Sequence, residues 1–158
     1  RIESGNMSFH CEDCSAHHFA ETVYQTHQVI ILPPVEFIKE FPDEDVTIHI
    51  DRMRLTQVIT NFLGNAKKFT SQGHIKLGYF CDKEKKEIHI FVEDTGAGIP
   101  KEELQMIFER FYKRNEFVQG VGLGLAISKV IVEKMNGHID VQSEVNKGSR
   151  FTAVLPYL

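Results

Sequence analysis

Apolar side chains recur along the chain at two different intervals, and each interval predicts one kind of element. Apolar and polar positions alternate over residues 87–93, where Ile88, Ile90 and Val92 fall on one side. This alternation is typical of a strand with one buried face. Shorter stretches of the same kind predict further strands over 7–13, with Phe9 and Cys11 on one face, and over 35–41, 46–50, 74–81, 138–143 and 149–155.

Steps of three and four residues predict four helices. They are expected over 15–28, with Ser15 as N-cap, over 51–70, with Asp51 as N-cap, over 101–109 after Pro100, and from about 120 to 136. The apolar stripe of the second comprises Leu55, Val58, Ile59, Phe62, Ala66 and Phe69. The apolar stripe of the last helix comprises Leu123, Ile127, Val130, Ile131 and Met135.

A polar band runs beside the stripe of the helix expected over 51–70. It consists of Gln57, Asn61, Asn65 and Lys68, which recur at helical steps. Asparagine is a poor helix former unless its amide has a task. Its carbonyl oxygen can bind Mg²⁺, and a lysine can meet phosphate. The alternative is a polar face that neighbouring backbone satisfies.

The stretch from Asp94 to Pro100 places a carboxylate where a strand runs out into a loop. Gly96 and Gly98 follow it, and glycine lets a backbone adopt unusual angles and approach a flat ligand closely. A lone acid there suits a buried donor such as the exocyclic amine of a purine. The alternative is a tight turn with a solvated aspartate.

A third motif, Gly120-x-Gly122-x-Gly124, opens the last helix. Glycines at a helix N-terminus expose backbone N–H groups, and the helix dipole favours an anion there. The spacing differs from the dinucleotide-binding fingerprint, and the chain contains neither a P-loop nor the protein-kinase motifs. Close packing of helix on sheet is the other explanation of these glycines. The preceding segment, 113–119, reads as a loop that could cover a ligand.

The composition limits the classes of protein that remain. With 158 residues, 42% apolar and 25% charged, the chain suits a single domain over 1–158, in which 1–6 is a tail or the end of a preceding helical hairpin. A net charge of −4 gives no reason to expect nucleic acid or an anionic membrane as partner. No apolar run approaches the roughly 20 residues that cross a bilayer. The chain begins at Arg1 without a signal peptide, so we expect a piece of a longer protein.

The cysteines favour a reducing compartment, because their number is odd. Two of them form Cys11-x-x-Cys14 among several histidines, and such residues bind zinc at short spacings. No second ligand pair follows at the distance of a structural zinc site, so we expect cytosolic thiols and surface histidines. The residues concerned are Cys11, Cys14, Cys81, His10, His17 and His18.

Taken together, the three motifs resemble the ATP-binding catalytic domain of two-component sensor histidine kinases, in the superfamily shared with gyrase, heat-shock chaperone and mismatch-repair ATPases. The strings that carry the resemblance are Asn61-Phe-Leu-Gly-Asn65-Ala-Lys-Lys68-Phe69-Thr70, Asp94-Thr-Gly-Ala-Gly98-Ile, Phe108-Glu-Arg-Phe111-Tyr and Gly122-Leu-Gly124-Leu-Ala-Ile. They follow the family's order from about Val35 to Leu158. The resemblance implies an α+β fold, an α/β two-layer sandwich whose mixed, mostly antiparallel sheet of about five strands carries about three helices on one face.

The resemblance also implies roles for matching positions. Asn61 would be the Mg²⁺ ligand, Asn65 would meet the phosphates or ribose of ATP, and Lys68 would meet the phosphates. Lys113 and Arg114 are the candidate lid cations for the γ-phosphate. Asp94 would accept a hydrogen bond from the adenine amine. The remaining binding positions are Gly96 and Gly98 beside the ring, Phe108 and Phe111 as lid anchors, and Gly120, Gly122, Leu123 and Gly124 at the phosphates.

Members of this family transfer the γ-phosphoryl group of ATP to a histidine on a dimerisation hairpin, and a response regulator receiver domain is the next partner. None of the eight histidines here has the family's acceptor context of a following acid and Pro-Leu. The acceptor is therefore expected elsewhere in the parent protein. The family is mostly bacterial and its sensors are often membrane-anchored, so this domain should be cytoplasmic, without membrane contact of its own.

Three alternatives differ in class. A superfamily ATPase would carry a glutamate one helical turn before the metal-binding asparagine, as general base for water. This chain has Gln57 there, and a neutral amide cannot take the proton. The second is a nucleotide-binding or docking module without catalysis. The third is a plain α/β domain in which all the glycines and asparagines are structural.

Overall fold

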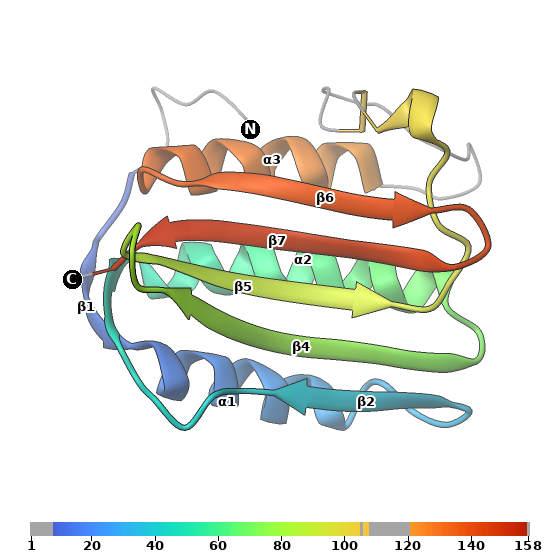
Figure 1. Cartoon of the computed structure of the whole chain (residues 1–158), viewed down its shortest axis with the longest axis horizontal. Helices are drawn as coiled ribbons and strands as arrows, with labels where there is room; N and C mark the ends of the chain where they lie inside the picture. The colour runs from blue at the N-terminus through green and yellow to red at the C-terminus, as the bar shows by residue number, and fades with distance from the viewer. Residues whose placement is uncertain (1–7, 105, 108–120, 158) are drawn as a thin grey trace.

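Five strands form the main sheet of the computed structural model, which describes residues 8–104, 106–107 and 121–157 (Figure 1). In sheet order they are β2 (Val35–Glu40), β4 (Gly73–Asp82), β5 (Glu87–Asp94), β7 (Gly148–Pro156) and β6 (His138–Glu144). β2 pairs with β4 in parallel, and the other neighbours are antiparallel. The sheet is therefore mixed and mostly antiparallel, as predicted.

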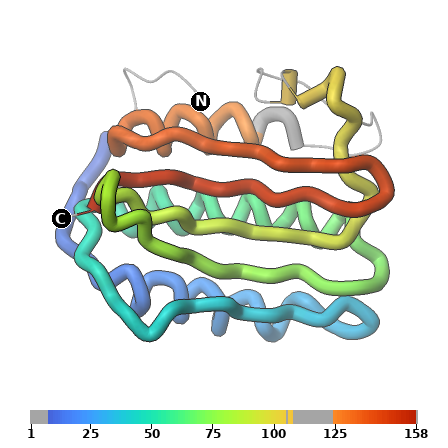
Figure 2. Tube along the Cα trace, viewed as in Figure 1, coloured from blue at the N-terminus to red at the C-terminus, as the bar shows by residue number. Residues whose placement is uncertain are grey.

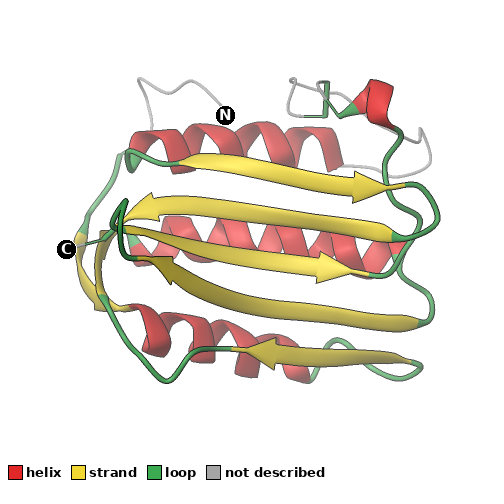
Figure 3. Ribbon diagram, viewed as in Figure 1, coloured by secondary structure: helices red, strands yellow, loops and turns green. Residues whose placement is uncertain are grey.

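Three helices cover one face of this sheet in the described part of the chain (Figure 3). They are α1 (Ala16–Gln28), α2 (Arg52–Phe69) and α3 (Val121–Lys134). The predicted two-layer α+β sandwich is confirmed. No described helix is long and apolar enough to cross a membrane.

The core lies between the helices and the sheet. Ile88, Ile90 and Val92 of β5 point toward the helices and are at most 1% exposed. On α2, Leu55 and Val58 are completely buried against them. Burial of each such side chain contributes about 1.5–3 kcal/mol. The alternating strand pattern and the helical stripe of the sequence thus meet in one core.

Both predicted helix caps are present. The Ser15 hydroxyl accepts a hydrogen bond from the backbone N–H of His18 at 3.1 Å, and Asp51 Oδ1 accepts one from the N–H of Arg54 at 3.1 Å. A side-chain cap satisfies one of the N–H groups that the first helical turn leaves unpaired. Asp51 Oδ2 also accepts from the N–H of His10 at 2.9 Å, which ties the N-terminal segment to α2.

The strand predicted over 7–13 is wrong in position. Strand β1 covers Glu12–Ser15 and pairs with β3 (Thr47–Ile50) in a separate two-stranded sheet. Its position is set by the partner strand, since Glu12 lies opposite Ile50. As a result Cys14 is buried and Cys11 is exposed, so Phe9 and Cys11 do not share a buried face.

The helix predicted over 101–109 is also wrong within the described residues. A single 3₁₀ turn, η2 (Lys101–Glu103), follows Pro100, and the N–H of Glu103 bonds to the Pro100 carbonyl at 2.9 Å. Leu104 and Ile107 still pack against the core. These two anchors lie three residues apart, a spacing that tight turns satisfy without a full α-helix.

Candidate functional site

The predicted motifs converge at one end of the sheet, where α2 ends, β5 ends and β6 turns into β7 (Figure 2). The backbone N–H of Ala97 donates to the carbonyl oxygen of Phe69, the last residue of α2, at 3.3 Å. The Ala97 carbonyl in turn accepts from the N–H of Asn146 in the β6–β7 turn at 2.8 Å. The loop after β5 is therefore fixed between the helix and the turn.

Asp94 is the last residue of β5 and is 8% exposed. Its Oδ1 accepts a hydrogen bond from the backbone N–H of Gly96 at 2.8 Å. Burial raises the pKa of the Asp94 carboxyl, and hydrogen bonds from the N–H groups of Gly96 and Ser149 oppose that effect. A carboxylate removed from water in this way gains more from an added hydrogen-bond donor than an exposed one.

The two glycines after Asp94 have packing reasons of their own. A Cβ on Gly96 would overlap the carbonyl group of Phe69, and one on Gly98 would overlap the carbonyl group of Glu144. Gly98 also has a φ of 74°, in the left-handed region that favours glycine. The loop can therefore approach α2 and the β6–β7 turn only with glycine at these positions.

Gly148 and Ser143 support the same loop and were not singled out by the sequence. Gly148 has a φ of 126°, and a Cβ there would overlap the Asp94 carbonyl oxygen. The Ser143 hydroxyl accepts from the N–H of Ile99 at 2.7 Å and donates to the Gly148 carbonyl at 3.0 Å. Nothing in the sequence indicated that Gly148 pairs with Asp94, which lies 54 positions earlier.

Asn61 lies on α2 and faces α3. Its Nδ2 donates to the carbonyl oxygen of Gly124 at 3.2 Å and to Ser128 Oγ at 3.1 Å. Because a carbonyl oxygen only accepts, the amide nitrogen must face α3, and Oδ1 is the atom left to meet a metal ion. Ser128 is completely buried and was not predicted as a site residue, since its role depends on a contact between two helices.

The rest of the predicted polar band lies on the same helix. Gln57 stands one turn before Asn61, and Asn65 one turn after it; both are partly buried. Lys68 is exposed near the C-terminal end of α2. Gly122 and Leu123 belong to the first turn of α3, and Gly124 follows them. The structure therefore brings Asn61 of α2 beside the N-terminal part of α3.

Five predicted site residues lie outside the described residues. They are Phe108, Phe111, Lys113, Arg114 and Gly120. All lie between η2 and α3, a stretch that includes the loop 113–119 that was predicted to cover a ligand. Their predicted roles as anchors, lid cations and phosphate-binding backbone remain predictions.

Thr70 is a further polar residue at this end of the sheet. Its hydroxyl is buried, and no hydrogen-bond partner for it exists among the described residues. It lies directly beside Gly96, against the position a Cβ would occupy there. A buried hydroxyl without a partner costs about 1–3 kcal/mol, so a ligand that satisfied it would gain affinity.

Comparison with known proteins gives the family. The profile of the histidine kinase-, DNA gyrase B- and HSP90-like ATPases matches residues 50–158. Sensor histidine kinase WalK of Bacillus subtilis (strain 168) is 33% identical over 162 residues, which cover 99% of this chain and 26% of WalK. Sensor protein SrrB of Staphylococcus aureus (strain NCTC 8325 / PS 47) is 44% identical over 110 residues, which cover 67% of this chain and 19% of SrrB.

Solved structures agree with the profile. Full-length ShkA in complex with AMPPNP aligns with a TM-score of 0.85 and 27% identity over 96% of this chain and 32% of ShkA. The catalytic domain of histidine kinase ThkA aligns with a TM-score of 0.81 and 28% identity over 94% of this chain and 96% of that domain. The chain thus spans about a quarter or less of the two curated relatives but nearly all of the ThkA domain. It belongs to the histidine kinase-, DNA gyrase B- and HSP90-like ATPase family, as the ATP-binding catalytic domain of a two-component sensor histidine kinase.

Proposed function

We propose that this domain binds ATP with Mg²⁺ between α2, the loop after β5 and the N-terminal part of α3. It then transfers the γ-phosphoryl group to a histidine on a dimerisation hairpin elsewhere in the parent protein. The observation that carries the proposal is the buried Asp94 carboxylate, held by the Gly96 N–H at 2.8 Å beside a loop that only glycine permits.

On the base side, Asp94 accepts a hydrogen bond from the exocyclic amine of adenine. Guanine carries a carbonyl oxygen in place of that amine, and a carboxylate cannot donate to it. Gly96 keeps the loop close to α2, Gly98 keeps it close to the β6–β7 turn, and neither residue places a side chain beside the ring. The Thr70 hydroxyl, buried beside Gly96, is available as a second polar contact to the base.

On the phosphate side, Asn61 Oδ1 is the proposed ligand of Mg²⁺, because its Nδ2 is already engaged by α3. Oxygen ligands suit that ion, and when bound it offsets phosphate charge. Asn65 and Lys68 lie further along the same helix and meet the phosphates or ribose. The backbone of Gly122 and Gly124 contributes N–H groups and the positive end of the helix dipole.

For the transfer step we propose Lys68 and a lid cation, Lys113 or Arg114, at the γ-phosphate. Phosphoryl transfer depends mainly on positioning and charge neutralisation, which these groups supply. Gln57 stands one turn before Asn61, where a hydrolysing enzyme needs a general base. We therefore expect transfer to protein rather than rapid hydrolysis.

The partners follow from this reaction. The acceptor is the helical hairpin of the same parent protein, and the phosphoryl group passes on to the receiver domain of a response regulator. The domain faces the cytoplasm, where ATP is, and needs no membrane contact of its own. The parent is a bacterial sensor in this proposal.

Calorimetric titration tests the nucleotide site. A non-hydrolysable ATP analogue with Mg²⁺ should bind with one-to-one stoichiometry, GTP should bind much more weakly, and Asp94→Asn should abolish the preference for the adenine nucleotide. The exposed Glu36→Gln is the matched control and should bind as the unaltered chain does. Equal binding of ATP and GTP would contradict the assignment of Asp94.

Labelling with ATP that carries a radioactive γ-phosphate tests the reaction. The isolated chain should neither label itself nor hydrolyse ATP above background, and a parent fragment that contains the histidine hairpin should become labelled when both are mixed. Label on the isolated chain would contradict the proposed acceptor, and brisk hydrolysis would contradict the expected preference for transfer to protein. Binding without any labelling of the hairpin would favour a docking module.

A further inference from the structure

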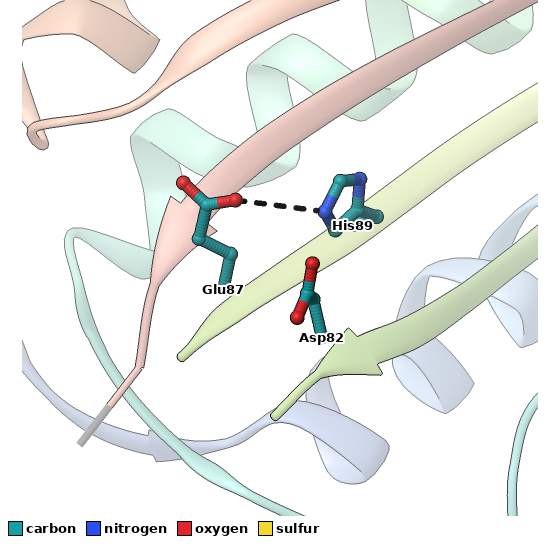
Figure 4. A group of neighbouring side chains, drawn as sticks. All are labelled: Asp82, Glu87 and His89. Atoms are coloured by element: carbon teal, nitrogen blue, oxygen red, sulfur yellow. Dashed lines mark ion pairs between the residues drawn. The ribbon is translucent and has the colours of Figure 1, made fainter. Parts of the chain in front are cut away.

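A second cluster of ligand-type side chains lies at the other end of β5, in the β4–β5 hairpin. Asp82, Glu87 and His89 project from the sheet face that the helices do not cover (Figure 4). One ligand atom from each lies within 4.8 Å of the others. Glu87 opens β5 and Asp94 ends it, so the cluster is about 23 Å from the nucleotide end at roughly 3.3 Å per residue.

The strand register brings the three side chains together. Asp82 and Glu87 are directly opposite one another across β4 and β5, and His89 is two residues beyond Glu87, on the same face. Directly opposite residues on one face have Cβ atoms about 4.5–5.5 Å apart. The arrangement is thus fixed by the backbone of the hairpin and not by flexible side chains alone.

His89 has a buried nitrogen with no hydrogen-bond partner among the described residues. This is Nε2, which lies 3.8 Å from Glu87 Oε1, too far for a hydrogen bond. The imidazole ring stacks on Phe80, with centroids 4.6 Å apart and an angle of 15° between the planes. Val154 is its cross-strand neighbour on the other side. An oriented imidazole nitrogen, aimed at two carboxylates and left unsatisfied, points to a missing ligand.

Asp82 is held in place as well. Its Oδ1 accepts from the backbone N–H groups of Glu84 at 3.1 Å and Lys85 at 3.2 Å in the hairpin loop. Such supporting hydrogen bonds orient a carboxylate that binds a metal ion. The second oxygen of Asp82 is then directed by the loop and not by side-chain rotation.

We propose that Asp82, Glu87 and His89 form a binding site for one zinc ion. Two carboxylates balance the charge of the dication, and an imidazole ligand suits zinc rather than Mg²⁺, which prefers six oxygens. Zinc bonds of about 2.0–2.1 Å place tetrahedral ligand atoms about 3.3 Å apart. A small contraction of the cluster meets that distance, and water takes the fourth position at the open face.

Calorimetric titration of ZnCl₂ into the 158-residue chain, with excess Mg²⁺ present, tests the proposal. One zinc ion should bind per chain, and both His89→Gln and Glu87→Gln should weaken that binding at least about tenfold. The matched control is His138→Gln. His138 also faces a carboxylate on the open sheet face, Asp140 at 3.6 Å, but belongs to no three-ligand group among the described residues.

Cobalt absorption distinguishes this site from the cysteines near the N-terminus. Co²⁺ bound by oxygen and nitrogen ligands lacks the charge-transfer band that a thiolate ligand produces. The proposal is overturned by a thiolate band, by no zinc binding, or by zinc affinity unchanged in either hairpin variant that is folded. Thermal unfolding without metal shows whether each variant is folded, and either variant alone suffices for the comparison.

Discussion

Asn61 on α2 donates its side-chain N–H to the carbonyl oxygen of Gly124 on α3, 3.2 Å away. The same nitrogen lies 3.1 Å from Ser128 Oγ. One amide group therefore joins the two helices and presents its oxygen to the space proposed for Mg²⁺ and phosphate. The structural role of Asn61 and its proposed metal-binding role are separable, because Ser128 takes part only in the former.

Asn61→Ala and Ser128→Ala should separate these roles. Each removes a buried hydrogen bond between α2 and α3, so each should lower the free energy of unfolding by about 1–2 kcal/mol. Only Asn61→Ala should also remove the dependence of nucleotide affinity on Mg²⁺. Denaturant unfolding and titrations with and without Mg²⁺ measure the two effects. Loss of the Mg²⁺ dependence in Ser128→Ala as well would show that helix packing alone holds the metal site.

Asp94→Asn should change how stability depends on pH. Burial raises the pKa of Asp94 in the folded state, so the folded protein binds more protons than the unfolded chain between the ordinary pKa and the raised one. Stability therefore falls as pH rises through that interval. Relative to Asp94→Asn, the unaltered protein should lose unfolding free energy between the ordinary aspartate pKa, about 3.9, and its raised value. If the unaltered protein instead gained unfolding free energy relative to Asp94→Asn as the pH rose, the hydrogen bonds to Asp94 would have a larger effect on its pKa than burial has.

Gly148 and Gly64 offer a matched pair of glycine-to-alanine substitutions, because a Cβ would meet close neighbours at the first position and open space at the second. The first substitution tests the packing of the Asp94 loop. Gly148→Ala should destabilise the protein by about 1–3 kcal/mol, because its φ is 126° and the added Cβ would overlap the Asp94 carbonyl. Gly64→Ala, in the middle of α2, has nothing within 4 Å of the added Cβ. That change should stabilise the helix by about 0.5–1 kcal/mol. Thermal unfolding measures both, and a stable Gly148→Ala would contradict the close approach of β7 to the Asp94 loop.

The elements that depend on local pattern were predictable from the sequence. The caps at Ser15 and Asp51, the stripe of α2 and the alternation of β5 each follow from residues close together in the chain. The buried face of α3 was harder to predict, because apolar residues lie on most sides of this helix. Of its predicted stripe Val130 is only partly buried, whereas Leu125 and Val132, outside that stripe, are buried. Periodicity identifies a buried face only when the other face is polar.

Residues whose roles depend on distant partners could not be predicted. Ser128 matters because Asn61 lies across from it, and Gly148 because Asp94 does. The position of β1 was set by pairing with β3 and not by its own pattern. The Asp82, Glu87 and His89 cluster also depends on strand register, which places residues of two strands face to face. Sequence spacing alone gave no reason to group them.

Glu93 and Arg150 provide a last prediction, on acid stability. The two lie opposite one another on β5 and β7, with Arg150 Nη2 and Nε donating to Glu93 Oε1 at 2.9 and 3.1 Å. Burial acts to raise the pKa of Glu93, but hydrogen bonding and charge from Arg150 and charge from Lys76 outweigh it and lower that pKa. The carboxylate therefore stabilises the folded state above the unfolded pKa of glutamate, and this contribution is lost as pH falls through the folded value.

Glu93→Gln should accordingly cost about 1–2 kcal/mol of unfolding free energy at neutral pH, since it removes the charge from a paired, partly buried carboxylate. The difference between Glu93→Gln and the unaltered protein should begin to shrink below about pH 4.3, the ordinary pKa of glutamate. Denaturant unfolding across this pH range measures it, with the exposed Glu36→Gln as control. A cost that persists unchanged in acid would assign the effect of Glu93 to packing and not to its charge.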